Sequence, residues 1–343
     1  MAEEQSQTPR QRRSGRRFAA ITAYTGGGVA AAGALGVGVL LGQVLLARLA
    51  IPGAEAPPPR SSGAYGHQYQ GTPLRLAVLG DSTAAGYGTR SRDETPGALL
   101  ATWIADATAR PVRLTCPAMV GAVSAWLPAQ VETVLQRGAD LAIIFIGAND
   151  VTTNRGGAAA VGHLYDSVRT LRAAGAEVVV ATCPDLGTVR PIRRPLRWLA
   201  RRWSRQLAAA QTIAVVRAGG RTVSLVDLLG PQFDAAPERM FGADRFHPSV
   251  EGYRAAAAAV LPSALAALGV TTEPQPVGAV QSLGDAAMAA AHRPGTEVSG
   301  DDVPTLSRAR SRLRRLVPRR GAAPGTQSDA VPSLSGQTQW EST

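Results

Sequence analysis

The chain has 343 residues, and its 36 basic residues, all of them arginine, outnumber 25 acidic residues to give a formal net charge of +11. Apolar residues make up 45% of the chain and charged residues 18%, which excludes both a chain disordered throughout and a protein with many membrane spans. Two cysteines exclude a disulfide framework and a cysteine-rich metal site, and four histidines leave few candidates for a catalytic base.

The N-terminal region combines an arginine-rich start with a long uncharged run. Residues 1–17 contain five arginines, and residues 18–47 contain no charged side chain. Thirty residues of helix would be about 45 Å long, which exceeds the roughly 30 Å hydrocarbon core of a bilayer. We predict an uncleaved transmembrane signal anchor over 18–47, since the apolar part of a cleaved signal peptide is only about 7–15 residues long. The arginine bias predicts a cytoplasmic N-terminus and an extracytoplasmic remainder at the cell membrane.

Two further segments are predicted to lie outside any folded domain. Residues 48–72 are rich in Pro, Gly, Ser and Ala, as in a flexible tether. Residues 271–343 have a similar composition without periodicity and are predicted to be mostly disordered. Within them, 305–320 has leucines on one helical face between arginines. This segment is either a basic amphipathic helix that contacts an anionic lipid or polymer, or a solvated arginine run.

The middle of the chain, 73–270, is predicted to be one domain in which strands and helices alternate. The predicted strands are 76–79, 112–114, 141–146, 178–181 and 223–226. The predicted helices are 96–109, 127–137, 158–174, 195–217 and 249–268. Five strands that are each followed by a helix predict an α/β fold with a parallel sheet covered on both faces. Ligands of such sheets bind at the carboxyl ends of the strands, so residues just after each strand are the ones to examine.

A serine follows the first predicted strand in the tripeptide Gly80-Asp81-Ser82. A serine at such a strand-to-helix turn exposes its hydroxyl at the mouth of the sheet, where a histidine held by a carboxylate can activate it. Taken alone, the tripeptide is equally typical of a turn and helix cap.

His247 is the histidine best placed to act as the base. His67 lies in the predicted tether, His292 lies in the tail, and His163 begins a helix, where a surface position is expected. Asp244 precedes His247 by three residues, so its carboxylate can reach the imidazole within one turn of chain. The alternative is a capping carboxylate beside a surface histidine.

Two other strand ends carry residues suited to stabilising an oxyanion. Asn149, after the third strand, has a side-chain amide that can donate a hydrogen bond, although an Asn-Asp pair is also typical of a turn. Gly121, after the second strand, has no side chain and would let a backbone N–H approach a bound acyl group.

These blocks, in this order and each behind a strand, resemble the SGNH hydrolase family, also called GDSL esterases and lipases. The resemblance implies a flavodoxin-like three-layer α/β/α sandwich with a five-stranded parallel sheet in the order 2-1-3-4-5. It implies that Ser82 is the nucleophile and first oxyanion donor, Gly121 the second donor and Asn149 the third, with Asp244 and His247 completing the triad. The anchor and the arginine-rich tail are most similar to membrane-attached actinobacterial members.

The resemblance implies acyl transfer to water through an acyl-enzyme, with no metal and no organic cofactor. The expected substrates are short-chain acyl esters, including acyl groups on envelope glycans or lipids. An acyltransferase with the same triad and a non-catalytic envelope-binding module are the alternatives. A lipase with a broad acyl groove has little support from an aromatic content of 5%.

Arginines recur every fourth residue from Arg193 to Arg205, just before and along the helix predicted over 195–217. Such a helix could lie beside the cleft and contact anionic headgroups or an anionic polymer, and a solvated charged face explains the same spacing. No nucleic-acid partner is expected for an extracytoplasmic domain. Cys116 and Cys183 follow non-adjacent strands and are predicted to be two buried residues without a mutual bond.

Overall fold

The computed structural model describes residues 56–153, 157–225 and 231–270, a few residues between 38 and 46, residue 287 and residues 297–298. The predictions for 1–17, for 305–320, for His292 and for most of 18–47 lie outside the described residues. Within the described ranges, none of the helices is both long and apolar enough to cross a bilayer. The membrane anchor therefore stays a prediction.

A seven-stranded sheet forms the middle layer of the domain, and its five central strands are parallel in the order β3-β2-β4-β5-β6. These strands are β2 (Leu74–Gly80), β3 (Val112–Thr115), β4 (Leu141–Phe145), β5 (Glu177–Ala181) and β6 (Arg221–Val223). Because both faces of a parallel sheet are covered, the β4 sequence Leu-Ala-Ile-Ile-Phe is buried at every position. The 2-1-3-4-5 order of the five predicted strands is confirmed.

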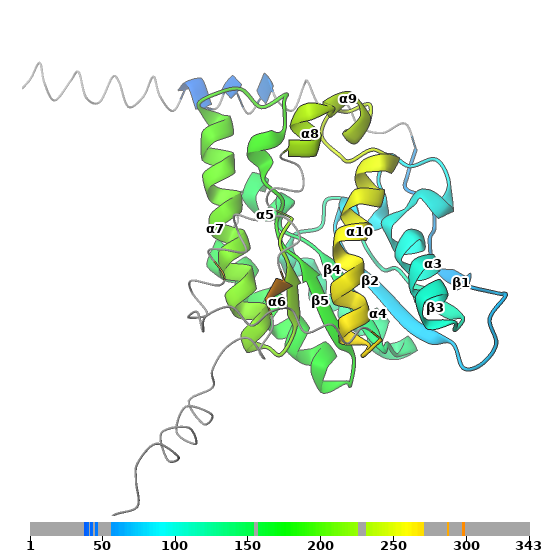
Figure 1. Ribbon diagram of the computed structural model, residues 1–343. Helices are drawn as coiled ribbons and strands as arrows, with labels where there is room; N and C mark the ends of the chain where they lie inside the picture. Colours follow the sequence, from blue (N-terminus) through cyan, green and yellow to red (C-terminus); the bar gives the residue numbers. More distant parts are fainter. Residues whose placement is uncertain are drawn as a thin grey trace, which may run out of the picture. The chain divides into compact units, whose positions relative to one another are not determined.

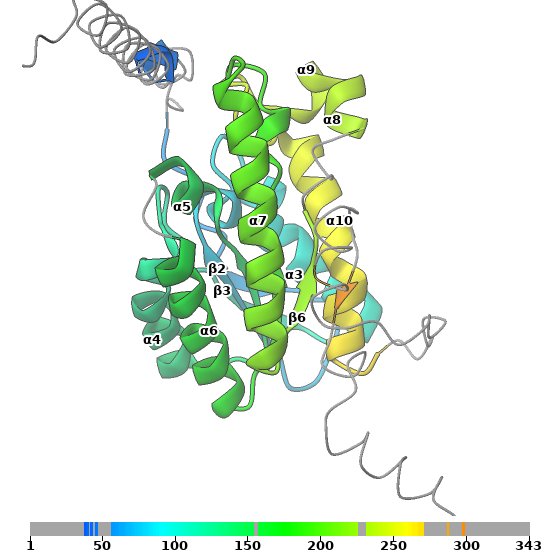
Figure 2. The ribbon, with the colours of Figure 1, turned by 90° about the vertical axis from the view of Figure 1, so that its left-hand side faces the viewer.

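Helices cover both faces of this sheet and complete the predicted three layers (Figure 1). On one face lie α3 (Pro96–Thr108) and α10 (Val250–Ala267). On the other lie α4 (Leu127–Arg137), α6 (Gly157–Ala173) and α7 (Leu196–Arg217), which stand side by side in Figure 2. The side chains of β2 alternate between the two cores, with Leu76 and Val78 toward α3 and α10, and Ala77 and Leu79 toward the opposite layer.

The sheet is wider than predicted at the edge next to β3. Strand β1 (Gly63–Tyr65) pairs antiparallel with β3, although these residues belong to the predicted tether 48–72. Tyr65 is buried, and its hydroxyl donates a hydrogen bond to the carbonyl of Ser61 at 2.6 Å. The strand has no apolar run of its own and is held by pairing with β3, so the folded domain begins before residue 73.

The opposite edge also differs from the prediction. Strand β6 begins at Arg221, two residues before the predicted start, because the turn at Gly219-Gly220 delivers the chain directly into register with Val179. Pairing with β5, and not the apolar run, sets its position. Strand β7 (Glu297–Val298) pairs antiparallel with β6, within the tail predicted to be disordered.

Short helical segments occupy the loops that follow the strands. They are α2 (Ser82–Ala85), η1 (Arg92–Glu94), η2 (Ser124–Trp126), α5 (Ala148–Thr153), η3 (Leu186–Thr188), α8 (Pro231–Ala235) and α9 (Pro237–Met240). Most of them follow the carboxyl ends of the strands, where a ligand of a parallel sheet binds.

Two buried glutamines hold the ends of the central strands in place. Gln130 of α4 accepts a hydrogen bond from the Gly80 N–H at 2.7 Å and donates one to the Gly80 carbonyl at 2.9 Å. Gln211 of α7 accepts from the N–H of Cys183 at 2.7 Å and donates to the carbonyl of Ile146 at 3.1 Å. Each amide thereby satisfies backbone groups that the ladder leaves unpaired.

We predict that Gln130→Leu lowers the free energy of unfolding by about 1–3 kcal/mol, because it leaves the buried Gly80 N–H without a partner. Urea denaturation of the two proteins measures the difference. The control is Gln136→Leu, an exposed position on the same helix, which should change stability by less than about 0.5 kcal/mol. Equal losses in both variants would contradict the role given to Gln130.

Candidate active site

Ser82 sits on a tight turn between β2 and α2. Gly80 has φ +134°, and a side chain there would collide with the backbone carbonyl of Phe145, so only glycine fits. Asp81 is the N-cap of α2 and accepts a hydrogen bond from the N–H of Thr83 at 2.8 Å. The turn therefore places the Ser82 hydroxyl at the carboxyl end of the sheet.

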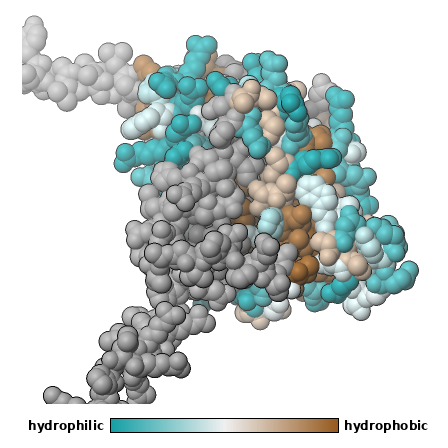
Figure 3. All heavy atoms as spheres, viewed as in Figure 1, coloured by the Kyte–Doolittle hydropathy of each residue, from teal (hydrophilic) through white to brown (hydrophobic). Residues whose placement is uncertain are grey.

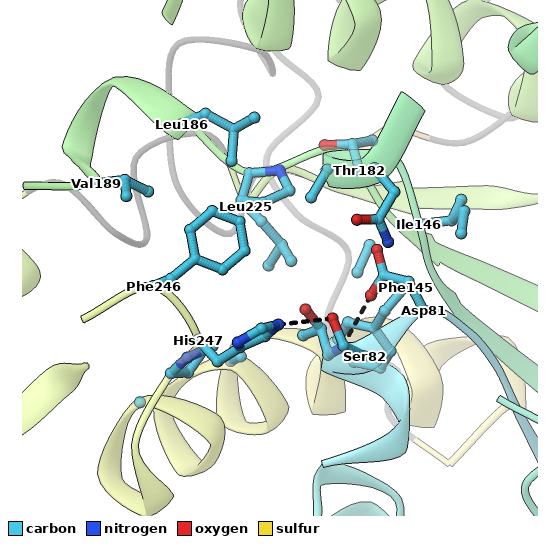
Figure 4. A pocket seen from close by; sticks show the side chains of 18 of the residues that line it. Asp81, Ser82, Phe145, Ile146, Thr182, Leu186, Val189, Leu225, Phe246 and His247 are labelled. Carbon is cyan, nitrogen blue, oxygen red and sulfur yellow. Dashed lines mark hydrogen bonds between the residues drawn. The ribbon is translucent and has the colours of Figure 1, made fainter. Parts of the chain in front are cut away.

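The side chains of Ser82, His247 and Asp244 lie in contact in series. Figure 4 shows the first of these contacts, between Ser82 and His247. The Oγ atom of Ser82 lies 2.9 Å from Nε2 of His247, and Nδ1 of the same ring lies 2.6 Å from Oδ2 of Asp244. When Nδ1 carries the proton beside the carboxylate, Nε2 is left to accept the serine proton. The three residues that the sequence predicted to meet are thus brought together across 165 positions of chain.

A strained turn makes the short Asp244-to-His247 contact possible. Arg245 adopts a left-handed backbone with φ +56°, and Oδ1 of Asp244 accepts hydrogen bonds from the N–H groups of Phe246 and His247, both at 2.9 Å. Burial by itself raises the pKa of the Asp244 carboxyl, but these hydrogen bonds and the one from the imidazole outweigh it and lower the pKa. Asp244 is therefore held as a carboxylate that can stabilise an imidazolium.

Two aromatic rings fix the plane of the His247 imidazole, and sequence analysis missed both. The Tyr87 ring lies 4.6 Å from the imidazole and the Phe246 ring lies 4.9 Å from it, the latter edge to face. Tyr253, which is fully buried, donates a hydrogen bond to the backbone carbonyl of Tyr87 at 2.8 Å. Phe246 is adjacent to His247 in sequence and could have been noticed, whereas nothing in the sequence indicates Tyr87.

Asn149 lies on α5 and lines the same pocket as Ser82 and His247. Its Nδ2 donates one hydrogen bond to the carbonyl of Ala122 at 2.9 Å, which orients the amide. The second N–H of the amide can then donate to a bound group. Gly147 directly precedes this helix at φ +132°, and a side chain on it would meet the Cβ of Cys183 at 2.7 Å.

Gly121 has a backbone conformation that favours glycine. It lies exposed on the loop after β3 at φ +80°, and a Cβ atom there would meet no protein atom within 4 Å. The left-handed backbone is one reason for glycine here, and the predicted approach of its N–H to an acyl group stays a prediction. Gly121 is not among the residues that line the pocket, so its role as an oxyanion donor stays a prediction.

The pocket beside Ser82 is largely apolar. Its apolar wall includes Phe145, Leu186, Val189, Leu225, Phe233 and Phe246. Figure 4 shows Leu186, Leu225 and Phe246 around the space next to the Ser82–His247 pair. Three of the five phenylalanines of the chain line this one pocket, so the low overall aromatic content says little about it.

The other chemistry-bearing residues singled out from the sequence lie elsewhere. His67 and His163 are exposed, and Cys116 and Cys183 are free thiols, of which only Cys183 is fully buried. Among the described residues, no three His, Cys, Asp or Glu side chains are grouped closely enough to hold a metal ion. Asp150, next to Asn149 on α5, accepts hydrogen bonds from the N–H and hydroxyl of Ser124.

Asp81 is an almost fully buried carboxyl next to Ser82, with an exposed fraction of 2%. Burial raises its pKa from an ordinary value of 3.8 to about 6, against the opposing effects of the Thr83 N–H and of His247. The charged form of Asp81 therefore destabilises the folded loop that carries the serine.

Comparison with known proteins places the chain in a family. The sequence model of the GDSL-like lipase/acylhydrolase family matches residues 78–255, which include Ser82, Asn149, Asp244 and His247. A GDSL-like esterase of Mycobacterium tuberculosis is 43% identical over 257 residues, which cover 70% of this chain and 81% of that protein.

Solved structures with a similar chain path are more distant in sequence. The crystal structure of TesA is 23% identical with a TM-score of 0.44 and covers 55% of this chain and 97% of its own. Axe2, an acetylxylan esterase from Geobacillus stearothermophilus, is 18% identical with a TM-score of 0.44 and covers 59% of this chain and 96% of its own.

We predict that Asp81→Asn removes a pH dependence of stability. A carboxyl whose pKa is higher in the folded state contributes stability that is fully present below about pH 4 and is lost as the pH rises through about 6. The shift from 3.8 to about 6 corresponds to about 3 kcal/mol. Between pH 4 and 7 the unfolding free energy of the wild type should fall relative to Asp81→Asn by up to this amount, as measured by urea denaturation at each pH.

The control for this prediction is Asp166→Asn, an exposed carboxyl on α6, whose stability curve should run parallel to that of the wild type. A parallel curve for Asp81→Asn as well would show that Asp81 does not titrate in this range.

Proposed function

The chain belongs to the GDSL-like lipase/acylhydrolase family and is a carboxylic ester hydrolase, and we propose that it hydrolyses short-chain acyl esters through an acyl-enzyme on Ser82. The observation that carries the proposal is the unbroken series of contacts from the Ser82 hydroxyl through His247 to Asp244, at the mouth of an apolar pocket.

In the first half of the reaction, the Ser82 oxygen attacks the ester carbonyl carbon while Nε2 of His247 takes the hydroxyl proton. Asp244 stabilises the imidazolium, and its short hydrogen bond to Nδ1 keeps the ring in the productive tautomer. The ester C–O bond then breaks, and His247 gives the proton to the leaving alcohol. In the second half, water loses a proton to His247 and attacks the acyl-enzyme. The bond between the acyl carbon and the serine oxygen then breaks, His247 returns the proton to that oxygen, and the acid is released.

The negative charge on the carbonyl oxygen needs donors that are already in position. We assign this role to the backbone N–H of Ser82, at the start of α2, to the Asn149 amide and to the backbone N–H of Gly121. The hydrogen bond from Asn149 to the carbonyl of Ala122 supports the assignment, since it holds the amide still before substrate arrives. A preorganised donor of this kind lowers the barrier by roughly 3–4 kcal/mol.

The acyl chain is proposed to enter the apolar pocket lined by Leu186, Leu225, Phe233 and Phe246. Each buried CH₂ group gains about 0.8 kcal/mol, or roughly fourfold in kcat/KM, as long as the pocket has room for it. Phe233, which is 1% exposed and packs edge to face on Phe241 at 4.7 Å, is assigned to the far end of this space. A wall at that end would favour short chains.

We predict that Ser82→Ala and His247→Ala each lower the rate of p-nitrophenyl acetate hydrolysis by at least about a thousandfold, because each removes an atom that takes part in bond-making or proton transfer. Matched controls are Ser167→Ala, a buried serine on α6, and His163→Ala, an exposed histidine on the same helix. Both controls should retain close to wild-type activity. Wild-type activity in Ser82→Ala would end the assignment of the nucleophile.

We predict that kcat/KM for p-nitrophenyl esters rises from acetate to about butyrate or hexanoate and falls at least about tenfold by laurate, as the pocket fills. Phe233→Ala should move the optimum toward longer chains by opening the closed end of the pocket. Phe241→Ala, the neighbouring ring that does not line the pocket, should leave the optimum in place. An optimum that both substitutions leave unchanged would mean that the acyl chain binds elsewhere.

A further inference from the structure

A wide surface hollow lies between turn η3 and the first turns of α7. We call it the arginine hollow, and its main lining residues are Thr188, Arg190, Arg194, Arg197, Trp198 and Arg201. We propose that the arginine hollow binds a phosphate group of the ester substrate, outside its acyl portion. This inference rests on the proposed esterase function and adds to it the chemical class of the rest of the substrate.

The hollow and the acyl pocket share one wall. Along the chain after β5, Leu186 and Val189 line the acyl pocket, whereas Gly187, Thr188 and Arg190 line the arginine hollow. The two spaces thus adjoin the same turn of backbone, and the proposal requires a substrate whose ester lies at Ser82 to extend past this turn. A group bound in the hollow would therefore belong to the alcohol portion of the ester, which leaves when the acyl-enzyme forms.

The shared wall is held rigidly by one buried carboxylate. Asp185, 1% exposed, accepts a hydrogen bond from the N–H of Gly187 at 2.8 Å and pairs with Arg205 at 3.0 Å and with Arg201 at 3.3 Å. The Arg201 side chain also packs directly against Gly187. A guanidinium at the floor of the hollow is thereby fixed in place before a ligand arrives, which lowers the entropic cost of binding.

The segment that lines the arginine hollow is strongly basic in sequence. Seven arginines lie between residues 190 and 205, and no Asp or Glu occurs from residue 186 to residue 226. The nearest acidic residue in sequence, Asp185, already pairs with two of the seven. Hydrophilic side chains cover the upper end of α7 in the space-filling view (Figure 3). Like charges held this close repel one another, and a bound anion relieves the repulsion.

Phosphate suits this arrangement better than a carboxylate. Guanidinium groups form paired hydrogen bonds with phosphate oxygens, and several arginines can share one tetrahedral dianion, whereas a carboxylate carries a single charge. Trp198, 58% exposed beside these arginines, adds an apolar plate on which the group that carries the phosphate can rest.

The test compares two acetate esters, phenyl acetate and 4-acetoxyphenyl phosphate, on the full chain in neutral detergent. The variant is Arg194→Gln/Arg197→Gln, which spares Arg201 and its bond to Asp185. We expect the variant to raise KM for the phosphate-bearing ester at least about tenfold, with kcat unchanged, and to hydrolyse phenyl acetate as the wild type does. Equal effects on both esters, or none on either, would overturn the proposal.

The matched control is Arg113→Gln/Arg137→Gln, which removes the same charge from a second arginine-lined hollow at the amino ends of β2 and β3. It should leave KM for both esters unchanged. If the control raised KM for the phosphate-bearing ester as much as the variant does, general electrostatic attraction would explain the effect and the arginine hollow would not be a site.

Two further measurements separate the possible outcomes. Calorimetry with inorganic pyrophosphate on the full-length Ser82→Ala protein should detect binding that Arg194→Gln/Arg197→Gln abolishes, and this readout holds even if the esterase assignment fails. Glycerol 3-phosphate and mixed detergent micelles containing phosphatidylglycerol are then compared as inhibitors of 4-acetoxyphenyl phosphate hydrolysis. Inhibition by the first indicates a soluble phosphate and inhibition by the micelles alone indicates a lipid headgroup; either supports the site, and inhibition by neither overturns it.

Discussion

One hydrogen-bond series joins two distant parts of the chain, from the Ser82 hydroxyl to the His247 ring and on to Asp244, and the proposed chemistry depends on it. Its distances are short enough for proton transfer only because each member is fixed by its own surroundings. The serine sits on a turn that admits only glycine at position 80, and the histidine lies between two aromatic rings. The carboxylate keeps its charge because three donors outweigh its burial.

The sheet supplies the rigid frame for this series. Parallel strands end at the same edge, and the buried amides of Gln130 and Gln211 bind the backbone groups that the ladder leaves open there. The same ends carry buried carboxyl groups, of which Asp81 has the pKa moved furthest toward neutrality. The buried Asp81 carboxylate beside the serine destabilises the fold, and burial of apolar side chains in the two cores on either side of the sheet stabilises it.

The two hollows on either side of turn η3 differ in character in a way that suits an amphipathic substrate. One is lined by leucine, valine and phenylalanine, and the other by arginines beside an exposed tryptophan. A single turn of chain separates them. The buried Asp185, which bonds to the N–H of Gly187 and pairs with Arg205, makes this turn rigid. An ester with a short apolar acyl group and an anionic remainder would match both surfaces at once.

The sequence by itself determined the α/β class and the bounds of the five long helices to within two residues, and it predicted that Ser82, Asp244 and His247 would meet. These follow from local periodicity and from the rule that parallel strands present their carboxyl ends together, whereas the strand order came from the resemblance to the SGNH hydrolase family. Only the tertiary structure decided the edge strands, the start of β6, the contact of the Tyr87 ring with His247 and the apolar pocket. Each of these depends on pairing or burial between residues far apart in the chain, which leave no periodic signal in the sequence around any one of them.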